Sequence, residues 1–224
     1  IVIGINLFRL VSIENVVQVL TDKLAEENTL AEKIVTDFGE VQLNVNTHLH
    51  SNRPSDYQTY LISLQRLYMD VGQAKDQMTS EERQTLLADI QNKIKAYEES
   101  YTKILKKIEE RKKMIEELDP QANEALSNLN LLRDKQTSTL SLFHVNQALE
   151  KSNTMFLKVQ QYLTNSDSAE LLPEIDKDYN AVITHIYKLN TLISNREQLT
   201  LLKNAQDHFT TYYQIFQTIQ SGFE

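Results

Sequence analysis

The stretch LADIQNKIKAYEESYTKILKKIEERKKMIEEL, residues 87–118, decides the fold class of this chain. An apolar or aromatic side chain recurs in it at intervals of three or four residues, and only Arg111 interrupts the series. The positions are Leu87, Ile90, Ile94, Tyr97, Tyr101, Ile104, Ile108, Arg111, Ile115 and Leu118. Such spacing places one apolar stripe along a long α-helix that packs side by side with other helices at a shallow angle.

The same spacing runs through both ends of the chain. Towards the N-terminus it occupies Ile3, Asn6, Leu10, Ile13, Val17, Leu20, Leu24, Glu27, Ala31, Ile34, Phe38, Val41, Val45 and His48. Towards the C-terminus it occupies Leu189, Leu192, Arg196, Leu199, Leu202, Gln206, Phe209, Tyr213, Phe216, Gln220 and Phe223. The 224 residues include only four glycines and three prolines, so turns are few and the helices must be long. These features predict an all-α protein.

Three prolines are expected to divide the chain. Pro54, Pro120 and Pro173 lie in turn-like sequence, and a proline inside a helix costs about 3 kcal/mol, so helices should end beside each one. The expected segments are about 1–50, 56–118, 121–163 and 174–224, with the second broken into 56–77 and 80–118. Short connections between long helices make neighbours antiparallel. The prediction is an elongated, double-length up-down-up-down helical bundle of two stacked four-helix modules.

Charge and composition exclude several classes of protein. The net charge of -8 argues against a nucleic-acid-binding protein, which needs a basic face. The chain has no cysteine, so it carries neither a disulfide scaffold nor a cysteine-based metal site. It also lacks a glycine-rich phosphate loop, a nucleophile elbow and the Glu-x-x-His pairs of a di-iron bundle. We therefore expect no enzyme activity, no catalytic residues, no metal and no cofactor.

Apolar and aromatic sequence lies at both chain ends, at 1–13 and 212–224. In an up-down-up-down bundle both ends lie at the same end of the rod, and neither stretch contains a capping sequence. One interpretation is that both helices continued into transmembrane helices that are absent from the sequence. The alternative is that they are ordinary bundle ends.

The stretch ILKKIEERKKMIEELDPQANEALSNLNLLRDK, residues 104–135, reads as a charged helix, a Leu-Asp-Pro turn and a second helix. With this layout the chain resembles the helical bimodular (HBM-type) extracytoplasmic ligand-binding domain of bacterial chemoreceptors, and its relative in the trimethylamine-oxide sensor kinase. The resemblance covers the layout of the whole chain but includes no invariant motif. It implies a homodimer, a ligand such as a small organic acid bound between helices, and a signal carried by small shifts of the last helix.

The resemblance also gives the expected domain organisation. Residues 1–224 would form a single sensor domain. Its membrane-proximal module would comprise about 1–26, 80–138 and 199–224, and its membrane-distal module about 27–79 and 139–198. The domain would be periplasmic, as part of an inner-membrane receptor.

Arginines on the helix stripes are the candidate ligand-binding residues. Heights estimated from the rise of about 1.5 Å per residue place Arg9, Arg111 and Arg133 near one layer of the membrane-proximal module, with Thr210 and Tyr213 beside them. A planar guanidinium binds a carboxylate through two hydrogen bonds, which suits an organic acid. The alternative is that each arginine reaches solvent or pairs with a glutamate such as Glu124.

Two functions follow from this sequence. The first is the ligand-sensing domain of a bacterial transmembrane receptor, most simply a methyl-accepting chemotaxis receptor, that signals by helix displacement. The alternative is a non-enzymatic coiled-coil scaffold or tethering rod. A cavity lined by arginines from several helices would favour the sensor, and the scaffold predicts no such cavity.

Overall fold

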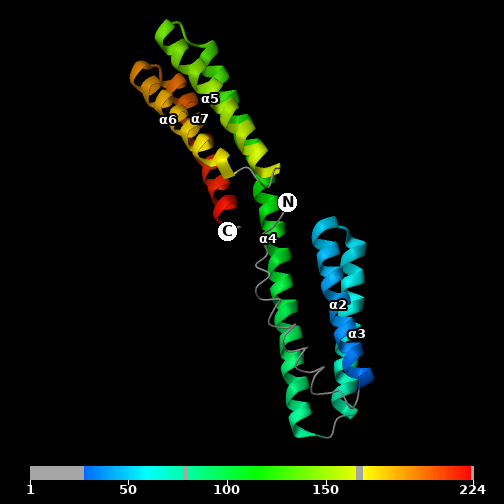
Figure 1. Ribbon diagram of the computed structural model, residues 1–224. Helices are drawn as coiled ribbons and strands as arrows, with labels where there is room; N and C mark the ends of the chain where they lie inside the picture. Colours follow the sequence, from blue (N-terminus) through cyan, green and yellow to red (C-terminus); the bar gives the residue numbers. More distant parts are fainter. Residues whose placement is uncertain (1–27, 78–79, 165–168, 223–224) are drawn as a thin grey trace. The chain divides into compact units, whose positions relative to one another are not determined.

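The computed structural model describes residues 28–77, 80–164 and 169–222 (Figure 1). Every secondary-structure element in these ranges is a helix, which confirms the all-α prediction. The elements are α2 (Asn28–Ser51), α3 (Pro54–Gln77), α4 (Glu81–Asp134), α5 (Thr139–Thr164), the short 3₁₀ helix η2 (Ala169–Leu171), α6 (Leu172–Leu192) and α7 (Arg196–Ser221). None of these helices is both long and apolar enough to cross a membrane.

The chain divides into two compact units between Lys107 and Ile108. Among the described residues these are the N-terminal unit, 28–107, and the C-terminal unit, 108–222. The helix α4 belongs to both, because it runs without interruption from Glu81 to Asp134. Each unit has its own buried apolar cluster.

In the N-terminal unit, α2 and α3 form an antiparallel hairpin that packs with the first half of α4. Asn52 closes α2 in the left-handed region, with φ of 51°, and its N–H donates to the His48 carbonyl at 2.8 Å. Pro54 then begins α3, where a missing N–H costs nothing. The α2 positions expected from the sequence are all buried: Ala31, Ile34, Phe38, Val41, Val45 and His48.

In the C-terminal unit, the second half of α4 packs with α5, α6 and α7 around one core. The core includes Leu118, Leu129, Val145, Met155, Phe156, Ile175, Ile186, Leu202, Phe209 and Phe216. His208 of α7 lies 2.7 Å from the Gln121 side-chain oxygen of α4, which ties the last helix to the first of this unit. Lys158 of α5 reaches α6, with Nζ 2.7 Å from Asp178 and 2.8 Å from Glu174.

The predicted helix end at Pro120 is wrong. Pro120 lies inside α4 on an exposed face, while Leu118, Ala122 and Ala125 are buried beside it. The buried stripe continues through Leu129 and Leu132. A fully buried leucine contributes about 1.5–3 kcal/mol, so the leucines of this stripe together outweigh the roughly 3 kcal/mol cost of the proline.

The breaks expected beside Pro54, between 77 and 80 and before Pro173 are confirmed, but two further turns were not predicted. The predicted segment 121–163 is interrupted at 135–138, and the predicted segment 174–224 is interrupted at 193–195. At the second interruption the Asn195 side chain accepts hydrogen bonds from the backbone N–H groups of Glu197 and Gln198, at 2.9 and 3.2 Å, and so caps α7. After the first interruption, Leu140 and Phe143 lie on α5 and are 52% and 54% exposed.

The division into units also differs from the predicted modules. Those modules placed 139–198 apart from 80–138 and 199–224. In the structure, residues 139–164 and 172–192 share one core with 108–134 and 196–221. The difference arises because α4 continues through Pro120, so the chain reverses at 135–138 instead. It reverses again at 193–195, where the last predicted segment was expected to be continuous.

Candidate functional site

The structure separates the arginines that were expected to converge. Arg111 and Arg133 lie on the same uninterrupted helix, α4, and are 22 positions apart along it. At about 1.5 Å per residue this is on the order of 33 Å. The predicted meeting of Arg111 and Arg133 in one layer is therefore wrong, because it required the chain to reverse at Pro120. Arg9 lies outside the described residues.

Arg111 is half-buried and faces α5. Burial lowers the pKa of its guanidinium, and the charge interaction with Tyr162 of α5 opposes this shift. Even so lowered, an arginine remains protonated at neutral pH. Arg111 is thus a half-buried positive charge in the C-terminal unit, and its side chain is engaged in an interaction.

Arg133 lies in the last turn of α4, at a surface. Its side chain is 41% exposed and pairs with the adjacent Asp134 at 3.2 Å. The neighbouring Lys135 pairs with Glu197 of α7 at 3.0 Å. This is the alternative considered from the sequence, in which the arginine reaches solvent and pairs with a carboxylate, although the partner is Asp134 and not Glu124.

Tyr213 is engaged in the contact between α6 and α7. Its ring stacks on Tyr179, with centroids 3.8 Å apart and planes at 6°, and its hydroxyl donates to Asp176 at 2.5 Å. Burial and this hydrogen bond raise the pKa of Tyr213 to about 12. Thr210 lies half-buried one turn earlier on α7. These two residues share a helix face, but the hydroxyl of Tyr213 already has a partner.

A shallow polar depression lies near the end of α7. It is lined by Gln214, Gln217, Thr218, Gln220 and Ser221. None of its lining residues is an arginine. It therefore does not supply the arginine-lined cavity that would favour a sensor.

The densest group of charges joins α2 to α3 and was not predicted. Arg66 of α3 donates from Nε to Asp37 at 2.9 Å and also bonds to Glu40. One turn further, Lys33 donates to Asp70 at 2.6 Å. Asp37 and Asp70 are only 5% and 4% exposed, so both carboxyl groups are inside the hairpin. The sequence signal was the i,i+4 spacing of Lys33 with Asp37 on one helix and of Arg66 with Asp70 on the next.

A second cluster lies at the tip of the same hairpin. The Nδ1 atom of the buried His48 is hydrogen-bonded to the Tyr101 hydroxyl of α4, and the Tyr101 ring packs edge-on against Tyr60. Burial raises the pKa of both tyrosines. His48 is thus a core residue that links α2 to α4.

Two histidines face each other across α5 and α6. The Nδ1 atoms of His144 and His185 lie 3.0 Å apart, and the ring centroids are 5.3 Å apart. The difference between these distances is about twice the radius of an imidazole ring, so the two nitrogens point at one another. One ring must donate an N–H and the other must accept it, and the pair holds a single proton between the two nitrogens.

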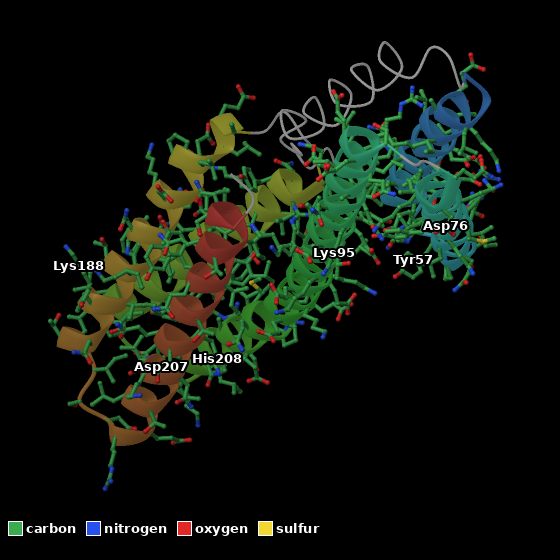
Figure 2. The ribbon with its side chains drawn as sticks, turned by 90° about the horizontal axis from the view of Figure 1, so that it is seen from below. Tyr57, Asp76, Lys95, Lys188, Asp207 and His208 are labelled. Carbon is green, nitrogen blue, oxygen red and sulfur yellow. The ribbon has the colours of Figure 1, made fainter. Side chains whose placement is uncertain are left out.

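We expect this pair to make the C-terminal unit acid-sensitive. Burial, together with the charges of His144, Lys188 and Lys151, lowers the pKa of His185. Figure 2 shows Lys188 on the outer side of α6. Because the folded-state pKa is below the unfolded value of about 6.5, the stabilisation is complete above that pH and is lost as the pH falls through the folded-state value.

We expect His185→Gln to remove this acid sensitivity. In the wild type, the free energy of unfolding should fall by about 0.5–1.5 kcal/mol on acidification, the value of one hydrogen bond. Chemical denaturation at a series of pH values below and above 6.5 measures it. His50→Gln, at an exposed position on α2, is the matched control and should keep the wild-type pH profile. An unchanged acid slope in His185→Gln would contradict the assignment.

The polar side chains described above link helices to one another. Over the described ranges, no three histidine, aspartate or glutamate side chains are grouped so that they could hold a metal ion. The polar clusters instead join neighbouring helices: α2 to α3, α2 to α4, α5 to α6, and α6 to α7. No family model, curated protein or solved structure matches the chain.

Proposed function

We propose that this chain is the extracytoplasmic ligand-sensing domain of a bacterial transmembrane receptor, most simply a chemotaxis receptor. The ligand is a small metabolite, with organic acids as the first class to test. The domain would act as a homodimer attached to the inner membrane through flanking transmembrane helices. Two stacked four-helix modules remain part of this proposal.

The observation that carries the proposal is the continuity of α4. One helix places Leu87, Ile90 and Ile94 in the core of the N-terminal unit. The same helix places Leu118 and Leu129 in the core of the C-terminal unit. A ligand that binds one packing of the helices better than another shifts the population towards that packing. Small sliding or rotation of α4 would then transmit a change in one unit to the core of the other.

The scaffold or tethering rod remains the second candidate, and two observations favour it. Arg111 and Arg133 do not form a shared anion site. In addition, large apolar side chains of the α2–α3 hairpin face solvent, with Leu43 63%, Ile62 66% and Met69 66% exposed. Exposed apolar side chains are a feature of surfaces that bind other proteins.

A thermal-shift screen of the purified chain against small metabolites tests the sensor proposal. A ligand that binds only the folded state at 100 times its dissociation constant adds about 2.7 kcal/mol of stability and so raises the melting temperature. We expect at least one metabolite to do so. The shift should persist in Arg133→Ala, because that side chain lies at the surface beside Asp134.

Three results would contradict parts of this proposal. No shift across a broad panel of acids, amines and sugars would reject direct metabolite sensing and favour the scaffold. Loss of the shift in Arg133→Ala would restore an arginine site at the end of α4. A shift produced by amines alone would keep the sensor and reject the organic acid.

A further inference from the structure

Two buried carboxyl groups in the α2–α3 hairpin each leave one oxygen without a donor. Asp37 accepts from Arg66 through Oδ1, and Asp70 accepts from Lys33 through Oδ1. The Oδ2 atoms of both residues are buried and have no hydrogen-bond partner. The two side chains belong to one cluster, because Lys33, one turn before Asp37 on α2, contacts Asp70, and Arg66, one turn before Asp70 on α3, contacts Asp37.

Ionised carboxylates accept hydrogen bonds and cannot donate them, so two ionised carboxyl groups buried in one cluster repel each other. Burial makes this costly, because an unsatisfied charged oxygen inside a protein loses the full value of its hydration. A proton between the two oxygens turns the repulsion into a short hydrogen bond. A single shared proton thus gives each of the two carboxyl groups a partner in the other.

The surrounding charges match one added proton. Lys33 and Arg66 supply two positive charges, while Asp37, Glu40 and Asp70 supply three negative ones. One proton therefore makes the group neutral, whereas a divalent metal cation would leave it positively charged. On α4, the third described helix of this unit, Lys93 lies 4.0 Å from Asp89 and Glu98 accepts from Tyr68, so both are engaged elsewhere.

We propose that Asp37 and Asp70 form a proton-binding site: their carboxyl groups share one proton, and this proton holds α2 against α3. Asp37 carries the proton and donates it to Asp70. This inference does not depend on the proposed sensing function. It makes the α2–α3 hairpin a proton-linked element of the fold.

The titration behaviour of the pair agrees with this assignment. Burial and the hydrogen bond with Asp70 raise the pKa of Asp37. Burial by itself would raise the pKa of Asp70, but the hydrogen bonds from Asp37 and Lys33 hold this pKa below its usual value. The stabilisation from Asp37 is therefore complete below the unfolded value of about 3.9 and is lost as the pH rises through the raised value. The stabilisation from Asp70 is present above a pH of about 3.9 and is lost as the pH falls through the lowered folded-state pKa.

The direct test is a pH titration of the aspartate side-chain carboxyl carbons by NMR in the wild-type chain, which needs no substitution. We expect Asp37 and Asp70 to titrate as a coupled pair in two separate steps, one below and one above the usual aspartate range. The exposed Asp76 of α3, labelled in Figure 2, is the reference position outside this cluster. Single steps for Asp37 and Asp70 within the usual range would overturn the proposal.

Substitutions give an independent readout. Asp37→Asn keeps an acceptor for Arg66 and an N–H donor for Asp70, so it imitates the protonated form. Its urea midpoint should lose the decline with rising pH that the wild type shows. Asp76→Asn is the matched control and should keep that decline. A pH dependence in Asp37→Asn equal to that of the wild type would overturn the proposal.

Discussion

Replacing Phe209 by alanine is expected to lower the free energy of unfolding of the C-terminal unit by about 3–5 kcal/mol. Phe209 is 0% exposed and lies on α7 at the centre of the core. Its ring stacks on Phe156 of α5, with centroids 5.6 Å apart and planes at 13°. Phe156 in turn packs against Tyr212 at 4.6 Å. The cost combines lost burial with the cavity that α5 and α7 leave when they relax only partly.

Urea denaturation followed by circular dichroism measures this loss, and hydrogen exchange of α5 and α7 assigns it to the C-terminal unit. Phe143→Ala is the matched control, since the same side chain is removed from the same unit at a position that is 54% exposed. It should cost less than about 0.5 kcal/mol. Equal losses for the two variants would show that the Phe209 position is not the centre of a packed core.

The predictable part of this fold is the part that depends on uninterrupted periodicity. The 3-4 spacing identified the buried face of α2 at every described position from Ala31 to His48. It also identified Leu202, Phe209 and Phe216 on α7. In these stretches hydrophobic burial is the largest favourable contribution, and side-chain spacing alone indicates which face is buried.

Turn positions were harder, because one local signal opposed the packing and another, which agreed with it, was not used. Pro120 is a helix breaker by itself, but the core residues on both sides of it hold α4 together. Asn195 with Gln198 three residues later fits the pattern of a helix N-cap, and this signal marked the start of α7 within a stretch that was expected to be continuous. Reading that cap would have placed the last reversal correctly.

The candidate site failed for a reason that follows from the turns. Heights along a rod are counted from the points where the chain reverses, so a misplaced reversal moves every later residue. Arg133 was assigned a position by counting from Pro120, yet the chain reverses only after Asp134. The α2–α3 charge cluster could not be located either, because pairing Arg66 with Asp37 requires the relative register of two helices. Periodicity gives the face of a helix but not its register against a neighbour.

Pro120→Ala is expected to raise the free energy of unfolding of the C-terminal unit by about 1–3 kcal/mol. Alanine restores an N–H that can donate to the Glu116 carbonyl four residues earlier, and it removes the contact of the proline ring with that carbonyl. Part of the gain, about 0.4–1 kcal/mol, is offset because alanine leaves the unfolded chain more freedom than proline does. Chemical denaturation of the two variants under the same conditions measures the difference.

Glu117→Ala, at a neighbouring exposed position of α4, is the control and should change stability by less than about 0.5 kcal/mol. If the free energy of unfolding rises in Pro120→Ala and not in Glu117→Ala, the core of the C-terminal unit holds α4 continuous against the preference of its own sequence. A loss would mean that the bend proline imposes is needed to fit Leu118 and Leu129 to the same core. In that case a straight α4 would pack less well, and the proline would be a shaping element of the C-terminal unit.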